Sequence, residues 1–263
     1  MFTTFFNMTT QPFSERIPVA KIVKDQSIEN SIAKLQYMLY QGDIALIHGQ
    51  TGVGKSTLIK LFLANIPLNQ YLPLYINFTH LKTSCLLNLI VAQLGESPKH
   101  TKDRLFLQIK EKIKRLNLTI LLIIDEAHLL ETDVITDLRL LISSAIEETS
   151  TLKIILSGQN AIRDNLKRSS LTDFAQRICV FCRINPLTKA ESFTYIDLQM
   201  KYAQSSENVF GQEAKEIIFE YSSGIPRQIN NIATASLINA SIQKLQFINH
   251  GLVMQTISEL QSF

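Results

Sequence analysis

The stretch Gly49–Ser56 constrains this chain more than any other part of its sequence. It fits the pattern G-x-x-x-x-G-K-[ST], which is typical of loops that bind nucleotide phosphates. An apolar run at 44–48 precedes it and apolar residues at helical spacing follow it, so the loop is expected between a buried strand and a helix. That context argues against a chance glycine-rich turn. The residues expected to bind nucleotide are Gly49, Gln50, Thr51, Gly52, Val53, Gly54, Lys55, Ser56 and Thr57.

The residue types in this loop suit phosphate chemistry. Glycines let the backbone adopt conformations that other residues resist, and they bring its N–H groups close to phosphate oxygens. The helix that follows directs its positive end toward the same oxygens. We expect Lys55 to reach the β- and γ-phosphates and the Ser56 hydroxyl to bind Mg²⁺.

A second functional stretch ends in Asp125 and Glu126. The five large apolar residues before Asp125 predict a strand buried on both faces, as in the centre of a parallel sheet. An aspartate at the carboxyl end of such a strand is suited to binding Mg²⁺ through water. Glu126 is then placed to polarise the attacking water. The alternative is a core strand that merely ends in two solvated acids.

Two shorter patterns have weaker functional interpretations. Asp125–His128 spells the D-E-A-H box of a helicase group, but the sequence after His128 provides no second motor domain. Cys179 and Cys182 have C-x-x-C spacing, typical of zinc or redox sites. They fall in a predicted strand, where positions three apart face opposite sides, so small buried apolar residues are the favoured interpretation.

The order of predicted elements indicates the fold class. Strands expected at 44–48, 73–78, 119–126, 152–160 and 178–183 alternate with helices, which predicts a parallel sheet covered on both faces. After Pro186 the pattern changes to helices alone, opened by a capping box at Thr188 and Glu191. We therefore expect an α/β P-loop fold with a five-stranded parallel sheet, followed by a small all-helical lid. The expected parts are an extension at 1–25 that packs on the core, the α/β core at 26–185 and the lid at 186–263.

Composition is that of an ordinary globular protein, with 46% hydrophobic and 19% charged residues. The net charge of +3 permits a nucleic-acid partner without arguing for one. A basic face at 102–116 is either a surface for phosphate backbone or a solvated surface, and the second is favoured. The longest apolar run is too short to span a bilayer, and the first residues lack a signal-peptide pattern. We expect a cytoplasmic protein with no direct membrane insertion.

Taken together, these motifs resemble the AAA+ ATPases over nearly the whole chain. The resemblance is greatest to the group that contains the secretion ATPase ExeA and the transposition ATPases of the TnsC and TniB type. Its most specific signal is the stretch Gly224–Asn231, which reads GIPRQINN. Further support comes from Pro12-Phe13, Gly49–Ser56, Ile123–Leu130, Leu138–Leu141, Ser157–Gln159 and Gln176–Ile178.

The resemblance implies roles for further residues. Asn77, at the end of the second strand, is expected to hold Glu126 inactive until a partner binds. Ser157 or Gln159 occupies the sensor position at the end of the fourth strand. Arg227, at the start of a lid helix, is expected to contact the γ-phosphate. The arginine finger that acts on a neighbouring subunit is Arg177, with Arg163 and Arg168 as rivals.

The resemblance also implies a cofactor, an assembly and a partner. ATP with Mg²⁺ is the expected cofactor, since no guanine-reading N-K-x-D motif occurs. Because the arginine finger acts in trans, we expect a homo-oligomer, either a ring or a filament. The first hypothesis is an ATPase that assembles on duplex DNA and recruits or activates a transposase, favoured because the chain ends soon after the lid. The alternatives are an ExeA-like secretion ATPase and an assembly protein with little turnover.

Overall fold

The computed structural model describes residues 1–14, 18–19, 22, 26–77, 83–145, 152–205 and 208–261. The chain divides into two compact units. An α/β unit comprises 26–50 and 55–184, and a helical unit comprises 1–25, 51–54 and 185–263. No helix in the described ranges is long and apolar enough to cross a membrane.

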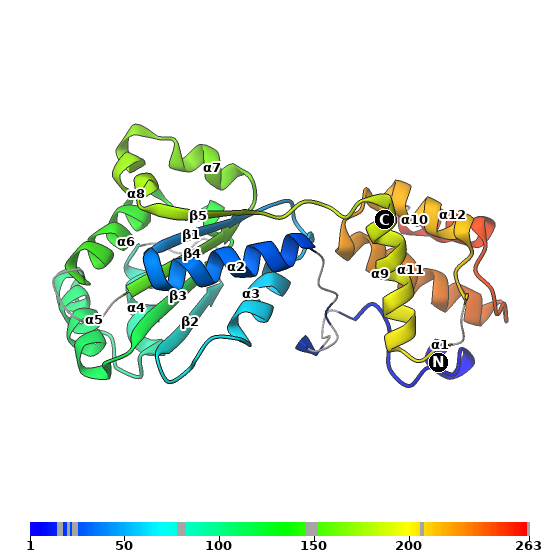
Figure 1. The fold of residues 1–263 in the computed structure, drawn as a ribbon, viewed down its shortest axis with the longest axis horizontal. Helices are drawn as coiled ribbons and strands as arrows, with labels where there is room; N and C mark the ends of the chain where they lie inside the picture. The colour runs from blue at the N-terminus through cyan, green and yellow to red at the C-terminus, as the bar shows by residue number, and fades with distance from the viewer. Residues whose placement is uncertain are drawn as a thin grey trace. The chain divides into compact units, whose positions relative to one another are not determined.

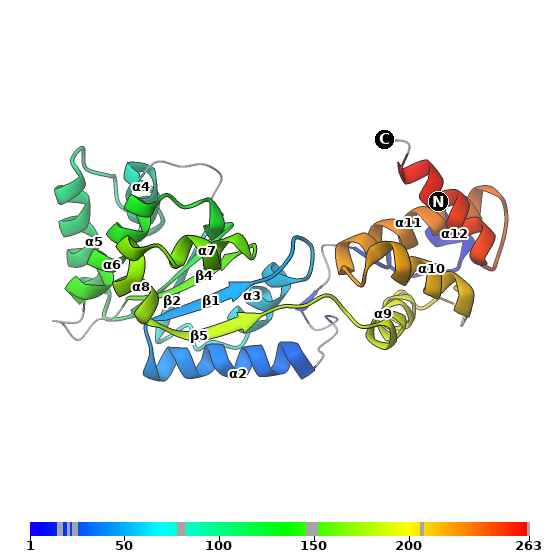
Figure 2. The same ribbon diagram turned by 90° about the horizontal axis from the view of Figure 1, so that it is seen from above.

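The α/β unit is built on a five-stranded parallel sheet with the order β2-β3-β4-β1-β5. Helices cover both faces, with α2 on one side and α4, α5 and α6 on the other (Figures 1 and 2). The predicted α/β class is therefore confirmed. The strands are β1 (Ile44–His48), β2 (Tyr71–Asn77), β3 (Thr119–Asp125), β4 (Leu152–Gly158) and β5 (Ile178–Arg183).

The strands differ in burial according to their place in the sheet. Every residue of β1 and β4 is buried, and in β3 only Thr119 is not fully buried. The edge strand β5 instead alternates buried and exposed residues, with Cys182 buried and Cys179 exposed. Central strands need apolar side chains on both faces, whereas an edge strand can leave one face in water. The expected strand at 73–78 begins two residues earlier, and residue 78 lies outside the described residues.

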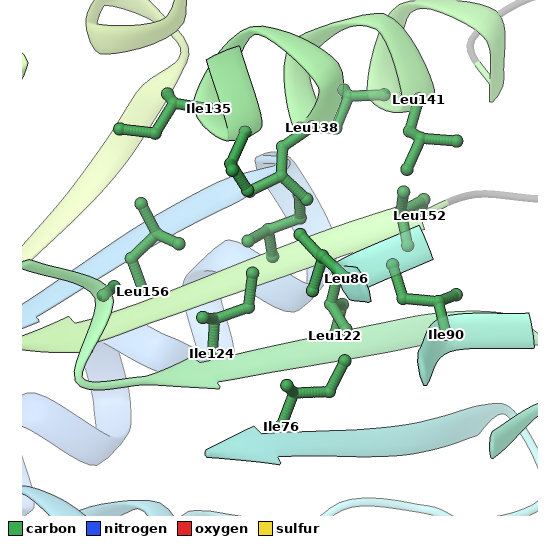
Figure 3. Close-up of a cluster of buried hydrophobic side chains, with 14 of the residues drawn as sticks. Ile76, Leu86, Ile90, Leu122, Ile124, Ile135, Leu138, Leu141, Leu152 and Leu156 are labelled. Atoms are coloured by element: carbon green, nitrogen blue, oxygen red, sulfur yellow. The ribbon is translucent and has the colours of Figure 1, made fainter. Parts of the chain in front are cut away.

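The helices of the α/β unit pack one apolar face on the sheet. On the side of α4 and α6, Leu86 and Ile90 meet Ile135, Leu138 and residues of three strands (Figure 3). The helices are α2 (Gln26–Gln41), α3 (Lys55–Leu63), α4 (Thr83–Gln93), α5 (Lys102–Leu116), η2 (Ala127–Leu129), α6 (Thr132–Ala145), α7 (Ala161–Leu166), η3 (Ser169–Leu171) and α8 (Thr172–Gln176).

In the helical unit, α9 begins with the predicted capping box. The Thr188 Oγ1 accepts a hydrogen bond from the Glu191 N–H, and the Glu191 carboxylate accepts one from the Thr188 N–H. This reciprocal pair satisfies backbone donors that a helix start otherwise leaves without partners. The helices of the unit are α1 (Phe2–Phe5), α9 (Lys189–Tyr202), α10 (Gln212–Ser222), α11 (Pro226–Ile242) and α12 (His250–Gln261).

The first residues of the chain belong to the core of the helical unit. Phe2, Phe6, Met8 and Phe13 are buried in one cluster with residues of α9 to α12. The Thr9 N–H also donates to the Ala203 carbonyl. This placement differs from the expected packing of 1–25 on the α/β core. The aromatic residues had to be buried, but their sequence does not specify which of two apolar cores receives them.

This placement predicts that Phe6 stabilises the helical unit. Phe6 is 1% exposed, so Phe6→Ala leaves a cavity and should lower the free energy of unfolding by about 3–5 kcal/mol. Phe247→Ala in the same unit is the matched control, because Phe247 is about half exposed and should cost less than about 1 kcal/mol. Urea unfolding followed by far-UV circular dichroism measures both. Equal losses in the two variants would contradict the packing of the N-terminal segment.

Candidate active site

The predicted phosphate-binding loop connects β1 to α3, as its sequence context indicated. Gly52 and Gly54 have φ values of +82° and +109°, which other residues rarely adopt. The Lys55 side chain is buried, and its Nζ donates to the carbonyls of Gly49 (3.1 Å) and Gln50 (2.9 Å). The loop therefore holds its own ammonium group beside the N-terminus of α3, where positive charge favours phosphate.

The centre of the site is the Asp125 carboxylate, which is 5% exposed. Its Oδ1 accepts hydrogen bonds from the Ser157 hydroxyl (2.8 Å) and the Glu126 N–H (3.0 Å). Its Oδ2 accepts hydrogen bonds from the hydroxyls of Tyr75 (2.6 Å) and Ser56 (3.2 Å). A buried carboxylate is costly without such donors, so these four bonds are what allow a charge at this position.

The strand order explains why these residues meet. Since β4 lies between β1 and β3, the carboxyl ends of the phosphate-loop strand, the Asp125 strand and the Ser157 strand share one edge of the sheet. β2 lies on the other side of β3, where Asn77 is in register with Asp125. Polar side chains at the ends of parallel strands converge on the crevice where ligands of open α/β sheets bind.

The oxygen atoms at this edge fit Mg²⁺. Mg²⁺ prefers oxygen ligands and keeps several waters, so the exposed Ser56 hydroxyl and the Asp125 carboxylate are a suitable donor set. Ser56 is exposed and its hydroxyl already contacts Asp125, which brings the two expected metal-binding residues together. When bound, the ion would neutralise charge on the β- and γ-phosphates.

Glu126 follows Asp125 in a left-handed conformation with φ +54°, which turns its side chain away from the strand direction. Its Oε2 lies 3.4 Å from His128 Nδ1, and the same Nδ1 lies 3.4 Å from the Gln159 backbone N–H. The two contacts require opposite states of Nδ1, because a carboxylate needs a proton there and an N–H donor needs a lone pair.

The other predicted site residues are placed as follows. Asn77 ends β2 and is exposed, and within the described part of the chain the Glu126 carboxylate contacts His128. Gln159 follows β4, but it is Ser157 that bonds to Asp125. Arg177 precedes β5, where the strands begin, because the next residue pairs with the first residue of β1. Asp125 lies where the strands end. Arg227 belongs to the helical unit, as the second residue of α11.

Sequence reasoning missed Tyr75 and the contact made by His128. Tyr75 lies two residues before the end of the edge strand β2. The local sequence pattern does not indicate the direction in which its side chain points. Burial and the hydrogen bond to Asp125 raise the pKa of its hydroxyl, so it remains a donor at neutral pH. The only available signal was a polar aromatic residue close to the end of a strand beside the Asp125 strand.

Comparison with known proteins identifies an AAA domain. Residues 38–166 match the AAA domain family. Over 257 residues the chain is 27% identical to General secretion pathway protein A of Aeromonas hydrophila. This protein contains an AAA domain. Both matches support a likeness to the ExeA-like group of AAA+ ATPases, for which ATP with Mg²⁺ is the expected cofactor.

The secretion relative is the longer protein. The match covers 95% of this chain and 47% of the relative, so the chain spans about half of that protein's length. Solved structures extend the likeness to the fold. The Aeropyrum pernix ORC2 protein, solved as ADPNP and ADP complexes, has a TM-score of 0.74 at 16% identity, covering 94% of this chain and 71% of that one. The Aeropyrum pernix ORC1 protein in complex with DNA has a TM-score of 0.72 at 14% identity, covering 92% and 67%.

The contacts of Asp125 predict a role for the buried Ser157 hydroxyl. Ser157→Ala removes a donor to Oδ1, so the carboxylate loses orientation and the rate of ATP hydrolysis should fall about tenfold or more. Ser31→Ala is the control, because Ser31 is also buried but its hydroxyl donates to the Ser27 carbonyl within α2, away from Asp125. Steady-state phosphate release at saturating MgATP measures both. Unchanged turnover in Ser157→Ala would show that this bond is dispensable.

Proposed function

We propose that this AAA+ ATPase hydrolyses ATP at the edge of the sheet around Asp125 and uses the reaction to control its own assembly on duplex DNA. The observation that carries the proposal is the grouping of Ser56, Asp125 and Ser157 beside a half-exposed Glu126. In this proposal Lys55 binds the phosphates and Asp125 orients the metal-binding hydroxyl of Ser56. Glu126 orients the attacking water and accepts its proton.

Completion of the site is proposed to need a second copy of the chain. Arg177 lies where the parallel strands begin and Asp125 lies where they end, so in this proposal Arg177 is too far away to act on ATP in its own subunit. Its side chain is half-buried and has no hydrogen bond or ion pair within the described residues. A free guanidinium on that edge is suited to stabilising phosphate charge in a neighbouring subunit. Arg227 is proposed to contact the γ-phosphate. Asn77 is proposed to hold Glu126 inactive until a partner binds, and Gln159 is proposed to position the attacking water.

Duplex DNA as a partner is supported by the fold shared with the DNA-bound ORC1 protein over 92% of this chain. The basic residues of α5 are not assigned to this contact. Lys102, Lys112 and Arg115 are each paired with a carboxylate, which supports a solvated surface. Within this proposal the DNA-bound assembly recruits or activates a transposase, a role that rests on the resemblance to the TnsC and TniB type.

A secretion role is the second candidate, favoured by a specific observation. The relative with 27% identity over nearly the whole chain is a general secretion pathway protein. The two candidates share ATP hydrolysis and differ in partner, so dependence on DNA separates them.

The first prediction of this proposal concerns assembly on DNA. Glu126→Gln removes the proposed base but keeps the shape of the side chain, so turnover should fall about 100-fold or more while ATP binding is retained. The variant should then form stable ATP-dependent assemblies on duplex DNA, measured by light scattering and negative-stain electron microscopy. Wild type should form them transiently and hydrolyse ATP faster with DNA. If DNA changes neither turnover nor particle size at low salt, the DNA proposal fails and the secretion candidate takes its place.

The second prediction concerns the trans-acting arginine. Arg177→Ala and Glu126→Gln subunits should each be nearly inactive alone, because each site lacks one group. Mixing them should restore measurable turnover, since a Glu126→Gln subunit can supply Arg177 to a site with intact Glu126. Arg163→Ala and Arg168→Ala provide the comparison, as both side chains are exposed. Restoration only with one of these two variants would transfer the role from Arg177 to that residue.

A further inference from the structure

The Tyr75 hydroxyl is one of two donors to Asp125 that come from exposed residues, and the Ser56 hydroxyl is the other. It lies 2.6 Å from Oδ2, the shortest of the four bonds to the carboxylate. Tyr75 is 39% exposed and lies on the edge strand β2. Ser157 is fully buried, and the Glu126 N–H is part of the backbone.

The number of acceptor positions on the carboxylate gives this bond a consequence. An ionised aspartate offers about four lone pairs, two on each oxygen. Protein donors occupy them all, with Ser157 and Glu126 on Oδ1 and Tyr75 and Ser56 on Oδ2. A water bound to Mg²⁺ also needs to donate to this carboxylate, because an aspartate in this position holds the ion through water. One protein donor must therefore leave when the metal binds.

The geometry points to Tyr75 as that donor: its hydroxyl caps Oδ2 in the metal-free protein and is displaced by a Mg²⁺-bound water. The inference rests on the proposed role of Asp125 in the metal site. Ser56 stays, because its hydroxyl can bind the ion through oxygen while it donates its proton to Oδ2. Ser157 and the Glu126 N–H stay because neither can move without opening the core. Tyr75 can rotate about χ1 toward solvent and exchange its bond to Oδ2 for one to water.

The cap has a benefit and a cost. The bond from Tyr75 helps to keep a buried carboxylate fully hydrogen-bonded, which stabilises its charge. The cost is competition with the metal, since a bond from a neutral hydroxyl to a charged acceptor must be broken when Mg²⁺ arrives. Tyr75 thereby sets how much Mg²⁺ strengthens nucleotide binding, and it is a positioning residue that does not touch the nucleotide in this inference.

Tyr75→Phe tests this inference through binding and not through turnover. The probe is a fluorescent, non-hydrolysable ATP analogue, titrated with excess MgCl₂ and again with EDTA. The ratio of the Kd in EDTA to the Kd in MgCl₂ measures how strongly the metal favours binding. Removing the hydroxyl should raise this ratio about three- to tenfold, which is less than the full value of a charged hydrogen bond because water replaces it in the metal-free state. The Kd in EDTA should stay within about twofold of wild type.

Tyr71→Phe is the matched control. Tyr71 lies on the same strand, but its hydroxyl donates to the Leu39 carbonyl, away from Asp125. Its ratio should equal that of wild type. Thermal melting of each variant checks that the fold is intact.

Two other outcomes overturn the inference or its basis separately. An unchanged or lowered ratio in Tyr75→Phe would mean that the hydroxyl is neutral toward the metal or helps to hold it, and the cap is then rejected. Asp125→Asn tests the basis, since its ratio should fall toward one. If Asp125→Asn keeps the wild-type ratio, Asp125 is not in the metal site and the proposed site fails with it.

Discussion

The α/β unit depends on one buried negative charge that is fully hydrogen-bonded. Asp125 ends the buried strand β3, and its carboxylate is bound by side chains from the phosphate loop, β2 and β4 as well as by the next backbone N–H. The three side-chain bonds each tie a different element to the end of β3. The same bonds that make the charge tolerable also determine which of its oxygens can face a metal.

The order of the strands is what makes this arrangement possible. β4 lies between the phosphate-loop strand and β3. Because β4 is next to β3, the short side chain of Ser157 near the end of β4 is long enough to reach Asp125. On the other side, β2 needs a long side chain to reach the same carboxylate from two residues before its end, and Tyr75 has that length. Function is concentrated where three strands end together.

Much of this could be predicted from the sequence, because its strongest signals are local. Three structures are each predicted by a few neighbouring residues: the loop Gly49–Ser56, the buried strand before Asp125 and the capping box at Thr188. The class of fold followed from the alternation of strands and helices. What could not be predicted depends on long-range placement. Neither the approach of Tyr75 to Asp125 nor the burial of Phe6 among α9 to α12 has a local pattern.

The most direct test of the central claim is a crystal structure of Glu126→Gln with ATP and Mg²⁺. We expect the ion to be bound by the Ser56 hydroxyl and, through water, by Asp125, with the bond from Ser157 to Oδ1 kept and the Tyr75 hydroxyl turned away from Oδ2. A metal ion held without Asp125, or a carboxylate that keeps all four protein donors beside bound Mg²⁺, would contradict the account.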